Sequence, residues 1–241
     1  MLKLCGSLAE SESVYNARIY TSLAAYGALP NPPLLYENER GERALLCGGV
    51  LTLDGTGFDK CELREFVKLC GCKKLICAAE TAEGLANAED TVFCTVMRFA
   101  GAVQPQCDDS VCRQPRLDDI YGLLCLAFDN MQSIGFEDWY SDISLKIRRG
   151  LACSYAIYED GVLCASAGVN YQNSKTIVIG SVATAKLCRG RGLATRLVNT
   201  LIAREAQGRA VQIVCKNAVA MRLYIKLGFV PIGVYAEINY I

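Results

Sequence analysis

The segment that most restricts how this chain can fold runs from Ile177 to Gln207. Residues 177–184 form an apolar, strand-like run, and the apolar positions of a helix begin at Leu193. Between them lies Arg189-Gly190-Arg191-Gly192, whose two glycines leave backbone N–H groups uncovered where the helix starts. A helix N-terminus carries partial positive charge and unpaired donors, and arginines can pair with phosphate oxygens. The segment therefore predicts a strand, a phosphate-binding loop and a helix, in that order.

Other glycine-rich loops also precede helices. A dinucleotide fingerprint requires a third glycine where Thr195 stands, a tighter turn after the strand and an acidic residue at the end of the next strand, and this chain has none of them. A Walker A loop requires Gly-Lys followed by Ser or Thr, which the loop lacks. A plain turn with two solvated arginines is the remaining alternative. From the loop alone, both this turn and a phosphate site stay open.

Length and charge exclude several classes of protein. The 241 residues suffice for one large or two small domains, and 52% hydrophobic with 21% charged residues is a globular balance. Lys plus Arg equals Asp plus Glu at 25 each, so no basic excess indicates a nucleic-acid partner. No signal peptide is recognisable, and no apolar run reaches the roughly 18 residues of a membrane span. We expect a cytoplasmic protein without a membrane partner.

Cysteine is abundant and histidine is absent. Without a signal peptide, 14 cysteines indicate small buried hydrophobes in a reducing cytosol. The closest pairs, Cys70 with Cys72 and Cys107 with Cys112, lack the C-x2-C spacing of a zinc knuckle, so no metal is predicted. The absence of histidine excludes Ser-His-Asp triads, Cys-His pairs and His-ligated metals. Proton transfer must then fall to a carboxylate, Lys, Tyr, Cys or water.

The first half of the chain has the pattern of a small α/β unit. Helices are expected at 11–28, 59–69 and 81–87, and strands at 34–36, 44–53, 74–78 and 91–99. Residues 101–114 contain Pro105 and little periodicity, which is typical of a linker. The sequence therefore predicts two domains, at 1–105 and 111–241.

The second half predicts a mixed sheet flanked by helices, within an α/β (α+β) fold. Helices are expected at 117–131, 136–148, 191–207 and 218–227, and strands at 151–158, 162–170, 175–184, 210–215, 230–232 and 234–239. Gly180, inside a strand, predicts a bulge or a close approach of another group. Asn217 and Gly228 are suited to cap the two ends of helix 218–227.

Two runs at this spacing resemble one known family. The first is Arg189-x-x-Gly192-x-Ala194 between a strand and a helix. The second is Asn217-x-x-Ala220-x-x-Leu223-Tyr224-x-x-Leu227-Gly228-Phe229. Together they are similar to the pyrophosphate loop and the following helix of the GCN5-related N-acetyltransferases (GNAT). The resemblance covers about residues 111–241 and implies a GNAT-like fold for this domain.

The resemblance implies a role for each matching residue. Backbone groups of Val182, Ala183 and Thr184 would pair with pantetheine, which inserts like a strand beside an opened sheet. The pyrophosphate would lie on the loop and first helical turn, formed by Arg189, Gly190, Arg191, Gly192, Leu193, Ala194 and Thr195. Asn217 would contact the pantetheine arm, or simply cap its helix. Tyr224 would protonate the departing thiolate, although core packing alone could also explain it.

The activity that the resemblance implies is transfer of an acetyl group from acetyl-CoA to a primary amine by direct attack, in a monomer or homodimer. The general base is not evident, because residues 176–184 contain no carboxylate. Glu137, Asp138 and Glu237 are candidates, and Cys188 beside Arg189 would allow a covalent route. The alternative is a non-catalytic acyl-CoA-binding sensor or interaction module on the same fold.

The first half carries no comparable motif. Its order of strands and helices is similar to the core of the second half, but the junction corresponding to the glycine loop is Asp54-Gly-Thr-Gly-Phe-Asp59. Two acids at that place would repel a phosphate. We therefore expect a degenerate acetyltransferase-like half that shapes the acceptor site.

Overall fold

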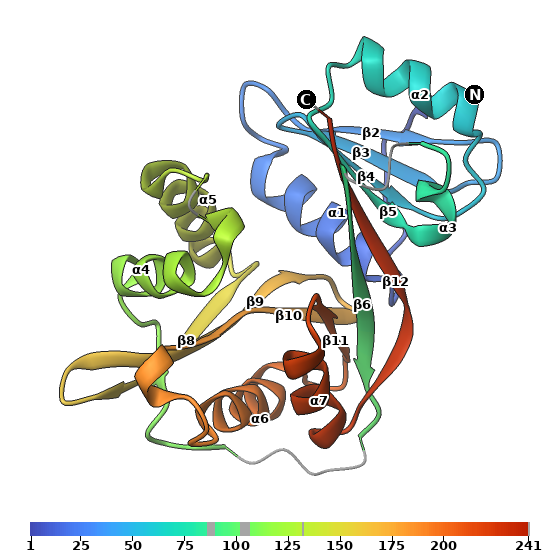
Figure 1. Cartoon of the computed structure of the whole chain (residues 1–241). Helices are drawn as coiled ribbons and strands as arrows, with labels where there is room; N and C mark the ends of the chain where they lie inside the picture. Colours follow the sequence, from blue (N-terminus) through green and yellow to red (C-terminus); the bar gives the residue numbers. More distant parts are fainter. Residues whose placement is uncertain (86–89, 102–106, 132, 241) are drawn as a thin grey trace.

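In the residues that the structure describes, one mixed sheet of twelve strands has the order β1-β2-β3-β4-β5-β12-β6-β11-β10-β9-β8-β7 (Figure 1). The computed structural model describes residues 1–85, 90–101, 107–131 and 133–240. The elements of the first half are β1 (Lys3–Leu4), α1 (Val14–Tyr26), β2 (Leu34–Glu37), β3 (Arg43–Cys47), β4 (Val50–Asp54), α2 (Lys60–Leu69), β5 (Lys74–Ala78), α3 (Ala79–Ala82) and β6 (Thr91–Phe99). Those of the second half are β7 (Cys112–Arg113), α4 (Leu117–Ala127), α5 (Phe136–Arg148), β8 (Cys153–Glu159), β9 (Val162–Gln172), β10 (Thr176–Thr184), α6 (Leu193–Glu205), β11 (Ala210–Cys215), α7 (Ala218–Lys226) and β12 (Phe229–Asn239).

The two halves repeat one order of elements and exchange their last strands. In each half, three antiparallel strands are followed by a helix and by a strand parallel to the third, β4 with β5 and β10 with β11. The last strand of each half then pairs with the other half: β6 with β11, and β12 with β5. β6 and β12 also pair with each other at the centre of the sheet. A single hydrogen-bonded sheet therefore joins the two halves.

The expected α/β fold is confirmed. The proposed boundary near residue 105 falls on residues 102–106, which lie outside the described residues, so the division into 1–105 and 111–241 stays a prediction. The short helix expected at 81–87 partly falls on residues 86–89, also outside the described residues, and the described helix there is α3.

Several expected elements have their predicted bounds, others differ by one to four residues at an end, and two runs form a different number of elements. β5, β6, β11 and α5 begin and end where the patterns predict. The run expected as one strand at 44–53 is a hairpin, because Gly48 and Gly49 have φ of 57° and 77° and turn the chain between Cys47 and Val50. The two short strands expected at 230–239 form the single strand β12, with a register shift between Pro231 and Gly233.

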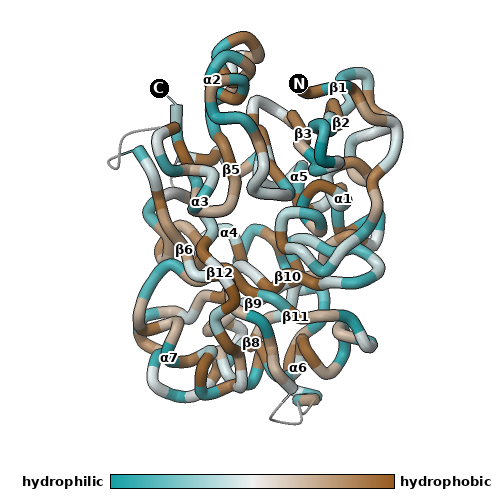
Figure 2. The backbone as a smooth tube through the Cα atoms, turned by 90° about the vertical axis from the view of Figure 1, so that its right-hand side faces the viewer, coloured by the Kyte–Doolittle hydropathy of each residue, from teal (hydrophilic) through white to brown (hydrophobic). Residues whose placement is uncertain are grey.

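Two apolar cores lie under the amphipathic helices. α6 buries its predicted face, Leu193, Leu197, Val198 and Leu201, against strands of the second half. α2 buries Leu63 and Val67 against β4 and β5 of the first half and β12 of the second half. Figure 2 shows hydrophobic positions along the central strands β6 and β12. Because β12 contributes to both cores, folding of the first half depends on residues near the end of the chain.

The cysteines and the helices bear on two further expectations from the sequence. All 14 cysteines lie in the described residues and none forms a disulfide. Cys77, Cys164 and Cys215 are buried within strands, whereas Cys47 and Cys94 are only partly buried. Among the helices that the structure describes, none combines the length and the apolar character needed to cross a membrane.

Candidate active site

The sheet opens between β10 and β11. These parallel strands pair only from Thr176–Ala210 to Ile179–Ile213, although each continues beyond that point. Past Ile179, β10 bulges: its register against β9 shifts between Gly180 and Ala183, and Ser181 has a φ of 53°. The bulge expected at Gly180 is thus present, and it leaves residues 180–184 of β10 without a β11 partner.

Gly180 also makes the close approach that a glycine in a strand suggests. A Cβ atom at Gly180 would lie 2.2 Å from Nδ2 of Asn170 on β9. The hydroxyl of Ser181 donates to Oδ1 of the same Asn170 at 3.2 Å, and the Ser166 hydroxyl donates to the Ser181 carbonyl at 3.2 Å. Asn170 therefore occupies the space of a missing side chain and supports the bulge.

A cavity of about 300 Å³ lies in this opening. β10, β11 and α7 form one part of its wall, and α1 and β12 form another. Of the residues singled out from the sequence, the cavity brings together Val182, Asn217, Tyr224 and Glu237. Ala183, Thr184 and the loop 189–195 do not line it, nor do Glu137 and Asp138, which lie in the first turn of α5.

Tyr224 of α7 lines this cavity and also belongs to the apolar core. The side chain is 5% exposed, and its ring contacts Phe229 with centroids 5.8 Å apart. Burial, with a smaller effect of Cys215, raises the pKa of the Tyr224 phenol. The phenol therefore stays protonated at neutral pH and can donate a proton.

Asn217 caps α7. Its Oδ1 accepts a hydrogen bond of 2.8 Å from the Ala220 amide, as its position in the sequence predicts. Because the cap uses only the oxygen, the amide nitrogen of this exposed, cavity-lining side chain can still donate to a ligand.

The loop before α6 has the backbone of an anion cradle. Gly190 and Gly192 have φ of 78° and 76°, which glycine adopts without strain. Gly192 is the N-cap of α6, and within the described residues no side chain caps the N–H groups of the first turn. The Nε of Arg189 donates to the Thr184 carbonyl at 3.2 Å. Arg191 instead forms an ion pair with Glu159 at the end of β8.

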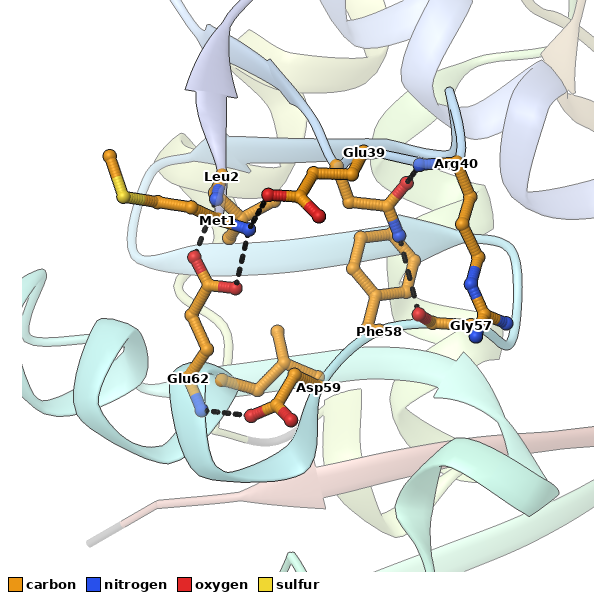
Figure 3. A pocket seen from close by; sticks show the side chains of 10 residues that line it. Met1, Leu2, Glu39, Arg40, Gly57, Phe58, Asp59 and Glu62 are labelled. Carbon is orange, nitrogen blue, oxygen red and sulfur yellow. Dashed lines mark hydrogen bonds and ion pairs between the residues drawn. The ribbon is translucent and has the colours of Figure 1, made fainter.

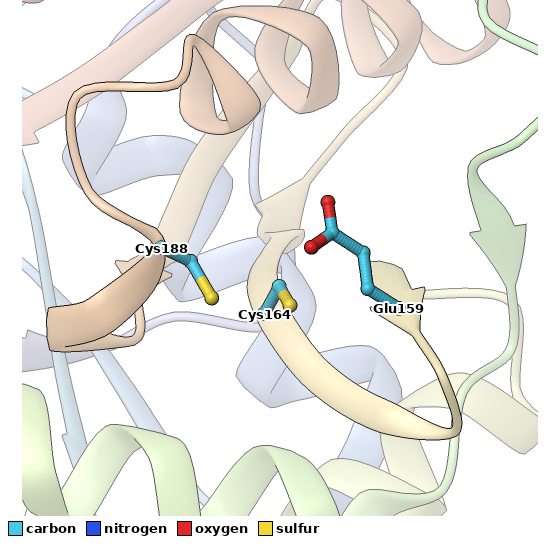
Figure 4. Close-up of side chains that lie close together, drawn as sticks. All are labelled: Glu159, Cys164 and Cys188. Atoms are coloured by element: carbon cyan, nitrogen blue, oxygen red, sulfur yellow. The ribbon is translucent and has the colours of Figure 1, made fainter.

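Beside this loop, Glu159, Cys164 and Cys188 lie close together (Figure 4). Their ligand atoms lie within 4.8 Å of one another. Burial, with smaller effects of Cys188 and Glu159, raises the pKa of the Cys164 thiol to about 11, so this thiol is not a thiolate at neutral pH. These three groups offer one ligand fewer than a closed zinc site requires, and Glu159 is already paired with Arg191.

A family model supplies the decisive comparison. The model described as Acetyltransferase (GNAT) family matches residues 117–229. Residues 117–229 are a GNAT acetyltransferase domain. The match lies within the range 111–241 that the sequence motifs indicate. No curated protein shows a significant match.

Solved structures extend the likeness in fold over nearly the whole chain. A putative GNAT-family acetyltransferase from Novosphingobium aromaticivorans has a TM-score of 0.59 at 20% identity and covers 91% of this chain and 94% of its own. A GCN5-related N-acetyltransferase from Kribbella flavida has a TM-score of 0.59 at 16% identity, covering 95% and 96%. A tandem GNAT protein from the clavulanic acid biosynthesis pathway has a TM-score of 0.53 at 14% identity, covering 99% and 98%. At these identities the likeness shows a shared fold.

The loop of the first half that corresponds to the GNAT loop is filled by carboxylates of the chain itself. Glu42 accepts hydrogen bonds from the amides of Thr56 and Gly57 at 2.9 to 3.0 Å. Asp59 caps α2 by accepting a 2.8 Å hydrogen bond from the Glu62 amide, beside a pocket that Glu39 and Glu62 also line (Figure 3). The N–H groups of this loop and of the first turn of α2 are therefore already hydrogen-bonded to carboxylates of the chain itself.

Sequence reasoning missed the part of the GNAT domain's cavity wall that the first half supplies. Arg18 of α1 lines the cavity, together with Tyr171 of β9 and Tyr235 of β12. No local pattern distinguishes Arg18 from any other arginine on a helix. Only the packing of α1 against β9 and β10 brings it to the site.

Proposed function

We propose that the protein is an N-acetyltransferase that transfers the acetyl group of acetyl-CoA to a primary amine by direct attack. One observation carries this proposal: the sheet opens beyond Ile179 and Ile213, and Tyr224 lines the cavity in the opening. The opening would accommodate an extended thioester arm, and the Tyr224 hydroxyl is a protonated donor at neutral pH.

Acetyl-CoA binding is assigned to the chain from Val182 to Thr195. The uncapped N–H groups at the start of α6, with the positive-φ glycines before it, suit a pyrophosphate. Arg189 adds a full charge there. The backbone of Val182, Ala183 and Thr184, which lacks a β11 partner, would pair with the pantetheine arm. Asn217 would donate its free amide N–H groups to the same arm.

In the proposed reaction, the amine nitrogen forms a bond to the thioester carbonyl carbon. The oxyanion that develops accepts a hydrogen bond from a backbone N–H near Val182. The C–S bond then breaks, and the departing thiolate takes the proton of the Tyr224 hydroxyl. The proton released by the amine passes to Glu237, directly or through water, since Glu237 is the carboxylate that lines the cavity in the described residues.

Glu237 also bears on the rival function, a non-catalytic acyl-CoA sensor. That reading draws its support from the absence of a base on the strand before the loop. Glu237 reaches the cavity from β12, a strand far from that position in the sequence. A side chain able to accept the proton is thus available, which favours the enzyme.

The experiment is thiol release from acetyl-CoA across a panel of primary amines. We expect turnover with at least one amine, and a fall in kcat of about 100-fold or more for Tyr224→Phe, which keeps the ring but removes the proton. Tight acetyl-CoA binding without turnover of any amine would favour the sensor. If acetyl-CoA does not raise the Tm of the protein, both functions fail, because a ligand that binds the folded state stabilises it.

We further infer that the first half is a degenerate acetyltransferase-like half that shapes the acceptor site. Its loop amides bind Glu42, and the Glu62 amide in the first turn of α2 binds Asp59, which leaves no place for a pyrophosphate. Its helix α1 contributes Arg18 to the cavity. One acetyl-CoA per chain, measured by calorimetry, is the expected result; two per chain would contradict the inference.

A further inference from the structure

Arg18 occupies a special position in the wall of the acceptor cavity. It projects from α1 and is partly buried, and its Nη1 donates a 2.6 Å hydrogen bond to the hydroxyl of Tyr171. The guanidinium carbon lies 4.8 Å from the centroid of the Tyr171 ring. It lines the same cavity as Tyr224 and Glu237, on which the proposed chemistry depends. Tyr171 thus holds the guanidinium in one orientation without neutralising it.

Two other cations of this region are already paired, whereas Lys216, which also lines the cavity, is exposed to solvent. Lys146 of α5 lies 2.8 Å from Asp142, and Lys74 of β5 lies 3.2 Å from Glu237. Arg18 has no carboxylate within 4.0 Å among the residues that the structure describes. A cation withdrawn from water without an anionic partner is costly, so an unpaired guanidinium at a cavity wall favours binding of an anion.

We propose that Arg18 binds a carboxylate of the acceptor, so that the substrate class is small amines that also carry a carboxylate, such as free amino acids. This inference rests on the proposed function, because it concerns the acceptor of the same cavity. The guanidinium fork matches a carboxylate with two parallel hydrogen bonds. A cavity of about 300 Å³ is at the small end of ligand pockets, which favours a small acceptor.

A purely structural role for Arg18 makes a different prediction. If Arg18 only connects α1 to β9 through Tyr171, its replacement lowers the stability of the protein and weakens the binding of all acceptors equally. If it binds the carboxylate, its replacement changes the ratio of affinities between an acceptor and the same acceptor without its charge. That ratio is the quantity to measure, because a general loss of stability does not alter it.

The test uses the full chain saturated with CoA, and calorimetry of amino acids paired with their carboxamides, across the common amino acids. We expect at least one amino acid to bind about 10- to 100-fold more tightly than its carboxamide, the effect of one or two hydrogen bonds to a charged group. In Arg18→Met this ratio falls to about one. In Arg18→Lys, which keeps the charge but loses the fork, it falls to an intermediate value. Arg148→Met, at the exposed end of α5, keeps the wild-type ratio.

The outcomes separate the inference from the proposed function, because binding does not require turnover. The inference is overturned if no pair shows a preference for the carboxylate, or if Arg18→Met keeps the preference. Should Arg18→Met fail to fold, the ratio in Arg18→Lys decides, and an unchanged ratio there overturns the inference. If acetyl is transferred equally well to carboxamides and to amino acids, the proposed enzymatic function stands, but Arg18 does not select the substrate. Preferential binding of amino acids without acetyl transfer would support the carboxylate site and contradict the enzyme.

Discussion

The guanidinium of Arg191 donates two hydrogen bonds, of 2.7 and 2.8 Å, to the carboxylate of Glu159. Glu159 ends β8, so the pair ties the β8–β9 hairpin to the loop before α6. The hydrogen bonds from Arg191 lower the pKa of Glu159. Of the two arginines of the GNAT loop, one therefore positions the loop and the other, Arg189, has no carboxylate within 4.0 Å in the described part of the chain.

This division between the arginines predicts different effects of their replacement. Arg189→Gln should weaken acetyl-CoA binding about three- to tenfold and reduce its dependence on salt, because an exposed charge on the phosphate is lost. Arg191→Gln and Glu159→Gln should have similar effects on acetyl-CoA binding, since each removes the same ion pair. Calorimetry at two salt concentrations measures both effects. An unchanged affinity in Arg189→Gln would remove Arg189 from the phosphate site.

Gly192 allows the charge of the loop to be tested separately from its shape. Its φ of 76° is one that Asn tolerates better than most residues, and a Cβ atom there meets nothing within 4 Å. Gly192→Asp should abolish acetyl-CoA binding by repelling the pyrophosphate, whereas Gly192→Asn, of equal size, should keep most of it. The Tm increase on adding acetyl-CoA distinguishes them. Equal binding by both variants would show that the phosphate does not lie on this turn.

The contact between Gly180 and Asn170 predicts a loss of stability that a second substitution partly restores. Gly180→Ala should cost about 1 to 3 kcal/mol of unfolding free energy, since the added methyl group overlaps the Asn170 side chain. Gly180→Ala combined with Asn170→Ala should recover part of this loss, because the overlap is gone. Denaturant unfolding of the wild type, the two single variants and the double variant gives the coupling energy between Gly180 and Asn170. Strict additivity would mean that the two residues do not interact.

Asp108 provides a pH-dependent prediction. Hydrogen bonds from Arg196, and then from Ser110, lower the pKa of Asp108 to about 2, against an ordinary value of 3.8. A carboxyl with a depressed pKa in the folded state contributes stability that is complete above 3.8 and is lost as the pH falls towards 2. The difference in unfolding free energy between wild type and Asp108→Asn should therefore be the same at pH 7 and pH 5, and smaller at pH 3. A constant difference down to pH 3 would contradict the assignment.

Much of the proposed acetyl-CoA site could be described from the sequence, because its parts are local. The glycines of 189–192 and the spacing of Asn217 and Tyr224 lie within single turns and helices, and short-range backbone preferences decide their conformation. The caps and the bulge were recognisable for the same reason. The turn at Gly48-Gly49 was equally local, but the continuous apolar run around it hid the hairpin.

The acceptor side could not be predicted in this way. Arg18 reaches the cavity because α1 packs on β9 and β10, more than 150 residues further along the chain, as its hydrogen bond with Tyr171 shows. Glu237 reaches it because β12 pairs with β5 and β6. Whether Arg191 faces a phosphate or Glu159 also depends on where the β8–β9 hairpin lies.

By itself, the sequence determined the class of fold, which follows from periodicity. Through its resemblance to a known family, it also indicated the GNAT domain and the residues that resemble a CoA-binding loop. Only the tertiary structure decided that the halves exchange β6 and β12, that the first half's loop is filled by its own carboxylates, and that Arg18 and Glu237 share a cavity with Tyr224. The physical reason is that strand pairing and helix docking are long-range choices. They depend on the burial of whole apolar faces, and the sequence of a single segment does not indicate which other segment it will pack against.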